Sequence, residues 1–257
     1  MRSASTGGLT TTAVSPVALT ARVDEREALR YLGMAATDRP QISPALRQVI
    51  DRMVAWAVSH LQPLGVHATY PVLVTDDCVE FAGTATELTL QSHDLARLLR
   101  GCELATIVAV TLGRELDDQI TLLTDQGRVA DAAILDAVGS DCVEQAVDEL
   151  CADLASAAVG KGFAVSERYS PGYGDLDLAA QPAVVAGAGG AAIGISVLPS
   201  LLMMPLKSVT AIFGWWRISD GDQVGRIAPD CQARCDRCTF EQCRFRRSNA
   251  SEGSRAR

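Results

Sequence analysis

The sequence predicts an α+β fold: one main domain with a small C-terminal appendage. Apolar runs of strand length, such as 105–113 (ATIVAVTLG) and 208–216 (SVTAIFGWW), are mixed with longer segments whose apolar residues recur at helical spacing. These segments do not alternate as a strict βαβ repeat, which favours α+β over a doubly wound sheet. At 257 residues, 48% of them hydrophobic, the chain can bury a sizeable core. We expect a mixed sheet with packed helices.

The first half of the chain contains two expected helices and three short strands. Residues 1–22 are expected to be a disordered lead, and the helix 23–34 (VDEREALRYLGM) has Gly33 as a plausible stop. In the helix 43–65, Ser43 is a suitable N-cap and Pro44 suits the first helical position. The expected strands are 68–74 (ATYPVLV), 78–83 (CVEFAG) and 86–90 (TELTL).

The second half contains the longest helical pattern. A helix capped by Ser92 is expected at 92–102, before the strand 105–113, and the pattern 128–159 is apolar on one face and carries Asp141, Glu144, Asp148 and Glu149 among its polar positions. After an irregular stretch at 168–178, a helix is expected at 177–192 and strands at 193–199 and 208–216. The core is expected to end with this last strand.

Charge and hydropathy argue against nucleic acid and membrane as partners. The formal net charge is −8, so the whole chain does not offer the clustered basic residues that phosphate binding needs. No charged residue lies between Asp177 and Lys207, but Pro182, Pro199 and Pro205 interrupt this interval, which argues against a membrane span. The N-terminal segment lacks an unbroken apolar run of the kind found in export signals. We expect a cytoplasmic protein.

Eight cysteines are distributed unevenly, and the last four suggest a metal site. They follow the spacing C-x3-C-x2-C-x4-C within residues 226–247, which we expect to form a separate Cys-rich tail before a disordered end at 248–257. Four thiolates at such spacing suit a [4Fe-4S] cluster or a tetrahedral zinc ion, and the spacing does not decide between them. The expected metal ligands are Cys231, Cys235, Cys238 and Cys243.

The stretch 168–178 (RYSPGYGDLDL) differs in composition from the apolar sequence around it. Pro171 fixes its own φ angle, and Gly172 and Gly174 allow backbone angles and close approaches that a Cβ atom would block. A tight turn between two elements would explain the Pro-Gly pair alone. The flanking Arg168 and Tyr173 favour a shaped loop with a binding role.

Two blocks of sequence resemble the activation domain of cobalamin-dependent methionine synthase. Residues 168–173 (RYSPGY) match its R-x-x-P-G-Y pattern, and 199–211 (PSLLMMPLKSVTA) resemble its E-S-x-A-M-x-P-x-x-S-V-S-G pattern. Segments 26–34 (REALRYLGM) and 110–120 (VTLGRELDDQI) are similar to stand-alone versions of the domain, so the resemblance extends over about residues 23–218, within an expected domain at 23–225. Pro199 replaces the family's Glu, and Thr210-Ala211 replace its Ser-Gly, which puts a polar contact in doubt.

The resemblance implies a protein that binds S-adenosylmethionine and supports reductive methylation of Co(II) cobalamin. Arg168 would bind the methionine carboxylate of S-adenosylmethionine, acidic residues of the long helix would bind its ammonium group, and the Tyr173 hydroxyl would act near cobalt. Tyr173 is the expected catalytic residue. The expected ligand-binding residues are Arg168, Ser170, Pro171, Gly172, Tyr173, Glu144, Glu149, Ser200, Met203 and Ser208.

The resemblance also implies partners, because the sequence does not resemble the cobalamin-, folate- or homocysteine-binding modules. The cobalamin would be carried by a separate corrinoid protein, such as a methionine synthase without its own activation domain or a related methyltransferase. A flavodoxin or ferredoxin-like protein would supply the electron. Two alternatives stay open: an iron-sulfur or zinc protein that acts in electron transfer or as a scaffold, and a sensor that binds S-adenosylmethionine without turnover.

Overall fold

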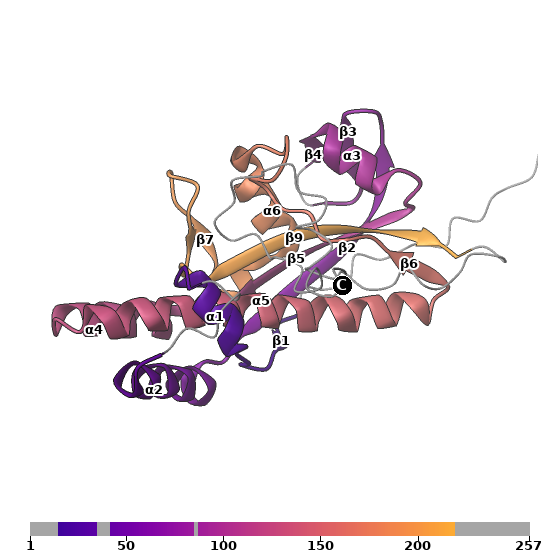
Figure 1. Ribbon diagram of the computed structural model, residues 1–257. Coiled ribbons are helices and arrows are strands. Elements are labelled where there is room, and N and C mark those ends of the chain that lie inside the picture. Colours follow the sequence, from indigo (N-terminus) through magenta and orange to yellow (C-terminus); the bar gives the residue numbers. More distant parts are fainter. Residues whose placement is uncertain (1–14, 35–41, 85–86, 219–257) are drawn as a thin grey trace, which may run out of the picture.

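The computed structural model describes residues 15–34, 42–84 and 87–218, drawn in colour in Figure 1. Seven strands form the main sheet, in the order β4-β3-β2-β5-β9-β6 with β1 paired to β2, and two more form a separate hairpin. The strands are β1 (Val17–Ala18), β2 (Leu64–Val74), β3 (Cys78–Phe81), β4 (Leu88–Gln91), β5 (Leu104–Thr111), β6 (Phe163–Val165), β7 (Ser196–Val197), β8 (Met203–Met204) and β9 (Ser208–Arg217).

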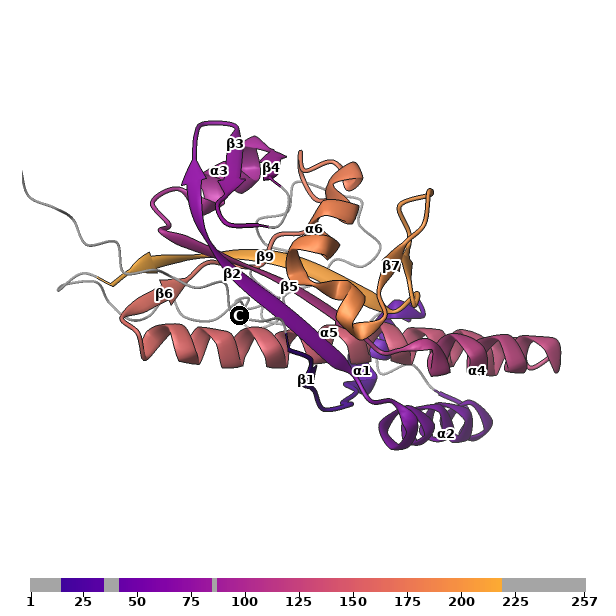
Figure 2. The same ribbon diagram turned by 180° about the vertical axis from the view of Figure 1, so that it is seen from behind.

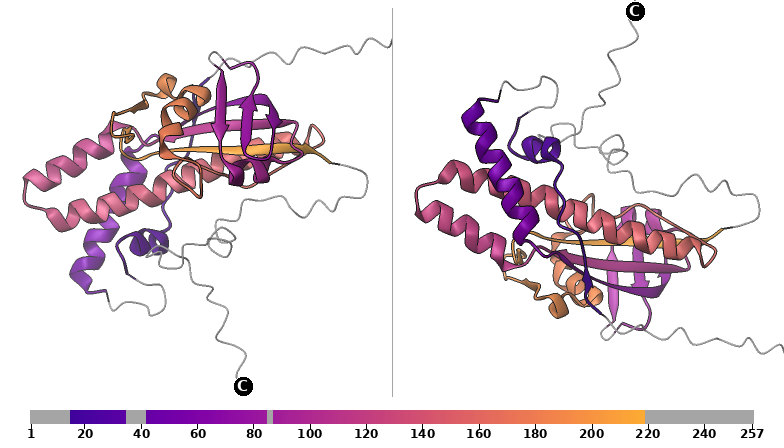
Figure 3. Two further views of the ribbon diagram at one scale, coloured as in Figure 1. Left: turned by 90° about the horizontal axis from the view of Figure 1, so that it is seen from above. Right: turned by 90° about the horizontal axis from the view of Figure 1, so that it is seen from below.

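Helices cover both faces of this sheet. The helices are α1 (Glu25–Tyr31), α2 (Pro44–His60), α3 (His93–Leu99), α4 (Arg114–Asp125), α5 (Val129–Val159) and α6 (Gln181–Ala188), with 3-10 turns η1 (Leu178–Ala180) and η2 (Gly190–Ile193). Helix α5 runs along one face, and α3, α6 and the β7–β8 hairpin lie on the other (Figures 1 and 2). Views from above and below show α4 and α5 lying side by side as a helical hairpin (Figure 3).

Strand β9 supplies side chains to two hydrophobic cores because alternate residues of a strand point to opposite faces. Ala211 and Phe213 belong to the core between the sheet and helices α2, α4 and α5. Ile212 belongs to the second core, which α3, α6 and η2 close. The irregular segment 166–178 runs beside β9 and can therefore approach groups on both faces of the sheet.

Helices α4 and α5 pack closely at a glycine of α5. A Cβ atom on Gly139 of α5 would lie 2.4 Å from Cδ2 of Leu116 on α4. The glycine thus lets the Leu116 side chain reach the α5 backbone. Leu116 and Leu135 are fully buried in this core, and burial of a leucine side chain contributes about 1.5–3 kcal/mol.

The α+β class is confirmed, but the sheet differs from the mixed sheet that we expected. All strand pairings among the described residues are antiparallel. The chain returns to the sheet through hairpin turns, as in β2–β3–β4, or through helices that deliver the next strand in the opposite direction. An apolar run does not reveal strand direction, because that depends on the end from which the chain re-enters the sheet.

Several element boundaries also differ from the expectations. Strand β1 lies before Val23, inside the expected lead 1–22, and pairs with Leu64 and Gly65 of β2. Helix α2 ends at His60 because Leu61 is extended, so β2 begins inside the expected helix 43–65. The expected helix 177–192 is divided into η1, α6 and η2, and Gly189 ends α6 in the left-handed conformation.

Other expectations concern the termini and the membrane. Within the described part of the chain, no helix has the length and apolar character needed to cross a membrane. The Cys-rich tail at 226–247 and the ends at 1–14 and 248–257 lie outside the described residues.

Candidate functional site

The loop that contains the R-x-x-P-G-Y motif is attached to strand β9. Tyr169 and Ile212 exchange backbone hydrogen bonds of 2.8 and 2.7 Å, so the loop begins as a short extension of the sheet. The Ser170 hydroxyl donates to the Thr210 carbonyl over 2.7 Å. These bonds hold the loop against the strand that contains the second sequence block.

The tip of the loop is a compact turn around Tyr173. The Gly172 amide donates to the Leu176 carbonyl over 2.8 Å, and Gly172 has a φ of +87°, which favours glycine. The Tyr169 hydroxyl donates to the Tyr173 carbonyl over 3.0 Å. Burial, with the charge of Asp94, raises the pKa of Tyr169 to about 12, so this phenol remains a donor at neutral pH. The Tyr173 side chain is 63% exposed and therefore available at the surface.

Arg168 lies under the loop and contacts the long helix. Its side chain is 2% exposed, and its guanidinium forms ion pairs with Glu144 (3.2 Å) and Asp148 (2.5 Å) of α5. The two carboxylates are one helical turn apart and about one third exposed, so they present their outer atoms to solvent. Glu144, one of the expected acidic residues, thus lies beside Arg168. Asp148 also pairs with Arg168. Its position four residues after Glu144 places both carboxylates on one face of a helix, and this spacing can be seen in the sequence.

The expected ligand-binding residue Glu149 has different contacts. Its carboxylate accepts hydrogen bonds from the Thr20 amide (3.3 Å) and hydroxyl (3.1 Å), and Arg22 lies 4.0 Å away. Glu149 therefore holds the N-terminal segment on α5. Of the two acidic candidates on this helix, only Glu144 pairs with Arg168.

Asp141 also fastens the N-terminal segment, and it is 2% exposed. Its carboxylate accepts a hydrogen bond of 2.6 Å from the amide of Asp24, the N-cap of α1. Burial raises the pKa of Asp141 to about 6, although hydrogen bonds from the Asp24 amide and the Gln145 side chain oppose this effect. Helix α5, which carries Glu144, thus also carries the buried carboxylate of Asp141 one turn earlier. Burial of this charged group destabilises the folded protein.

The second sequence block is linked to the loop through a chain of polar contacts. The Gln181 amide donates to the Thr210 hydroxyl (2.7 Å) and lies 3.3 Å from the Met203 sulfur. Thr210 stands where the family pattern has Ser, a replacement that put a polar contact in doubt. Thr210 nevertheless makes polar contacts, because its carbonyl also accepts a hydrogen bond from Ser170. The sequence did not single out Gln181, because its partner Thr210 lies far along the chain.

Two other residues of this block, Ser208 and Ser200, have different surroundings. The Ser208 hydroxyl is buried and within 2.8 Å of the Thr111 hydroxyl and 2.7 Å of the Pro205 carbonyl, so its hydrogen bonds are internal. Ser200 lies in the turn between β7 and β8. The structure therefore brings Ser170, Thr210 and Met203 into one network, while the contacts of Ser208 support the β9 strand.

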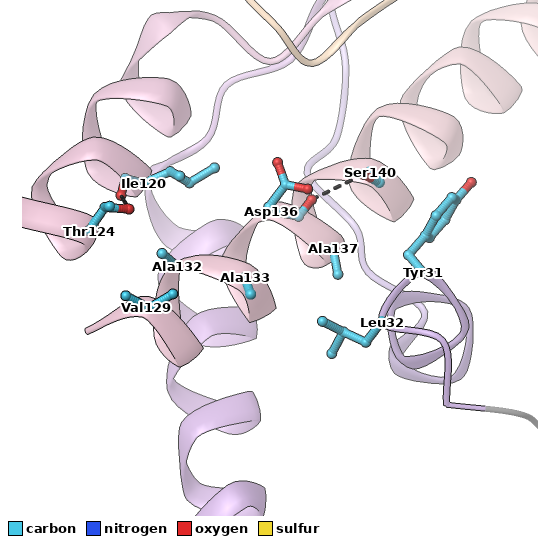
Figure 4. A pocket seen from close by; sticks show the side chains of 10 residues that line it. All are labelled: Tyr31, Leu32, Ile120, Thr124, Val129, Ala132, Ala133, Asp136, Ala137 and Ser140. Atoms are coloured by element: carbon cyan, nitrogen blue, oxygen red, sulfur yellow. Dashed lines mark hydrogen bonds between the residues drawn. The ribbon is translucent and has the colours of Figure 1, made fainter. Parts of the chain in front are cut away.

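A cavity of about 570 Å³ lies between α1, α4 and α5 (Figure 4). Alanine side chains form much of its wall on α5, and Tyr31 stands on the opposite side, on α1. Burial raises the pKa of Tyr31, and the negative charge of Glu144 raises it further. Its lining residues are Tyr31, Leu32, Ile120, Thr124, Val129, Ala132, Ala133, Asp136, Ala137 and Ser140.

No group of three or more potential metal ligands occurs among the residues that the structure describes. The four cysteines in this part of the chain are reduced thiols, and burial raises the pKa of Cys102 and Cys142 to about 11. Buried thiols with raised pKa values are poor nucleophiles. The predicted metal ligands Cys231, Cys235, Cys238 and Cys243 lie outside the described residues.

Together, the antiparallel sheet, the long helix α5 and the loop beside β9 form one α+β domain. The solved structure of the MetH reactivation domain bound to AdoHcy is similar to this chain, with a TM-score of 0.59 and 14% sequence identity. The match covers 82% of this chain and 80% of that one. No protein-family model and no curated protein matches the sequence. The structural match confirms the fold that the sequence resemblance implied.

Proposed function

We propose that this protein binds S-adenosylmethionine and supports reductive methylation of Co(II) cobalamin on a separate corrinoid protein. The observation that carries the proposal is the buried Arg168 under an R-x-x-P-G-Y loop, paired with α5 carboxylates within a reactivation-domain fold. The similar structure was solved with AdoHcy, which is S-adenosylmethionine without its transferred methyl group. This supports a site for the same class of ligand here.

The charges at Arg168 suit an amino acid ligand. The ligand's carboxylate would compete with Glu144 and Asp148 for the guanidinium, and its ammonium group would pair with the carboxylate that is displaced. Such an exchange would keep the buried guanidinium neutralised, which matters because an unpaired buried charge is costly. Gly172 would let the ligand lie against the loop backbone, and the Ser170 and Pro171 backbone would border it.

We expect Tyr173 to face the corrinoid partner, and its exposure of 63% at the loop tip supports this role. In the proposed reaction, the electron donor reduces Co(II) to Co(I), which attacks the sulfonium methyl group. The sulfur–methyl bond breaks, and the products are methylcobalamin and S-adenosylhomocysteine. The protein contributes mainly by holding methyl group and cobalt in line, with the Tyr173 hydroxyl acting near cobalt.

Substitution of Arg168 tests ligand binding. We expect Arg168→Ala to weaken S-adenosylmethionine binding by about 1.5–3 kcal/mol, the usual contribution of a hydrogen bond to a charged group. Calorimetric titration measures this, and Arg168→Lys should keep part of the affinity because it keeps the charge. Arg217→Ala is the control, because Arg217 is an exposed arginine of β9 that also pairs with a carboxylate, that of Glu103. A folded Arg168→Ala protein with wild-type affinity would refute the assignment.

The partner proteins need a separate test. We expect methylcobalamin to form when the protein is mixed with S-adenosylmethionine, a reduced flavodoxin or ferredoxin, and a methionine synthase or related methyltransferase that holds Co(II) cobalamin. Binding without methyl transfer to any such corrinoid protein would instead favour a sensor. A visible charge-transfer band in anaerobically purified protein would identify an iron-sulfur cluster at the four C-terminal cysteines, and zinc bound without such a band would identify a zinc site.

A further inference from the structure

The two aspartates of the loop, Asp175 and Asp177, have different partners. Asp175 reaches the start of α3, where its carboxylate accepts hydrogen bonds from the Ser92 hydroxyl (2.5 Å), the His93 amide (2.8 Å) and the Asp94 amide (3.2 Å). Asp177 accepts from the Ala179 amide, two residues away. Of these two aspartates, Asp175 is the one whose hydrogen bonds connect the loop to a segment that is distant in the sequence.

Helix α3 has its own cap as well as the bonds to Asp175. The Ser92 hydroxyl accepts from the Leu95 amide over 3.0 Å, which is the usual contact of an N-cap serine. Asp175 occupies two further amides of the first turn, which water could satisfy if the loop moved away. The distinctive effect of Asp175 is therefore the connection between loop and helix.

The neighbouring backbone fits closely around this connection. Gly174 has a φ of +50°, and a Cβ atom there would lie 2.2 Å from the Tyr169 hydroxyl oxygen and 2.5 Å from Oδ2 of Asp94. The Tyr169 hydroxyl also holds the Tyr173 carbonyl. The loop tip is thus fixed on one side by Tyr169 and on the other by Asp175. The hydrogen bonds to Asp175, above all that from Ser92, lower its pKa, so the carboxylate form makes these contacts at neutral pH.

We propose that Asp175 is a positioning residue, which ties the loop tip to α3 and so fixes the backbone of Gly172 and Tyr173 for the ligand and the corrinoid partner. This inference rests on the proposed function for its ligand, but the connection itself can be measured without one. Loss of one or two kcal/mol of such contacts changes the population of the fixed loop roughly five- to thirtyfold. The amides of residues 169–176 should exchange faster by this factor, and ligand affinity should fall in parallel.

The test uses the full chain with Asp175→Ala, Asp175→Asn and the matched control Asp177→Ala. Hydrogen exchange read by mass spectrometry reports the loop, and calorimetric titration with AdoHcy reports binding. We expect Asp175→Ala to show both effects and Asp177→Ala to change each by less than about twofold, as for most surface substitutions. Asp175→Asn should fall between them, because its amide oxygen can still accept hydrogen bonds while its NH2 group cannot replace the second acceptor oxygen.

Unchanged loop exchange in Asp175→Ala would overturn the proposal, and so would faster exchange with unchanged AdoHcy affinity. An equal effect of Asp177→Ala would show that any loss of a carboxylate in this stretch suffices, and would overturn it as well. If the wild-type protein binds neither AdoHcy nor S-adenosylmethionine, the proposed function fails. The exchange comparison would then still decide whether Asp175 fixes the loop. If Asp175→Ala does not fold, the same two measurements on Asp175→Asn decide the question.

Discussion

Replacement of Asp141 by asparagine should change how the stability of the protein depends on pH. The Asp141 carboxylate is buried on α5, and its contact with the Asp24 amide needs only an acceptor oxygen. An asparagine side chain has the same shape and keeps one such oxygen. The substitution therefore removes the buried charge while leaving the contact with the N-terminal segment.

The magnitude follows from the pKa of Asp141, which burial raises from 3.8 to about 6. At about 1.4 kcal/mol for each pH unit, this difference corresponds to about 3 kcal/mol. Because the folded state binds the proton more tightly than the unfolded state, the free energy of unfolding falls as the pH rises from 3.8 to about 6. Above that range the charged carboxylate costs the folded protein the full amount.

Urea unfolding of wild type and Asp141→Asn, followed by circular dichroism, measures this effect. We expect the advantage of the variant to grow by about 2–3 kcal/mol between pH 4.5 and pH 8. Asp153→Asn, at an exposed position of the same helix, is the control for general charge effects. A difference between wild type and Asp141→Asn that stays constant across this pH range would refute the reasoning.

Three further predictions address the loop, the core and the tail. Tyr173→Phe should bind S-adenosylmethionine nearly as wild type but reactivate its corrinoid partner more slowly, since the substitution removes only the hydroxyl that is proposed to act near cobalt. An unchanged reactivation rate would exclude a role for that group. Gly139→Ala should lower the free energy of unfolding by about 1–3 kcal/mol, because the added Cβ atom would lie 2.4 Å from the Leu116 side chain. A denaturant midpoint no lower than that of wild type would contradict this packing. Truncation after Asp230 should leave S-adenosylmethionine binding intact but slow the electron-dependent step, with a larger defect at low ionic strength. If the truncated protein reactivates cobalamin at the full rate with its physiological electron donor, the tail has no role in electron transfer.

The sequence by itself determined most elements and the location of the loop. Helical spacing predicted α5, and Ser43 and Ser92 cap their helices as expected. These features are local, because a cap or an apolar period depends on residues within one or two turns of each other. The R-x-x-P-G-Y pattern is local in the same sense, because its residues are contiguous in the chain. The pattern could therefore be recognised in the sequence, and it indicated both the loop and the fold type.

Only the tertiary structure decided the partners of the residues in that loop. Arg168 pairs with Glu144 and Asp148, and Asp175 accepts hydrogen bonds at the start of α3. These partners lie far apart in the sequence, and the folding of the chain around the sheet brings them together. Glu144 and Glu149 were equivalent candidates in the sequence, yet their side chains leave α5 in different directions and have different partners. Strand direction was also undetermined, since a side-chain pattern with period two is the same in parallel and antiparallel strands.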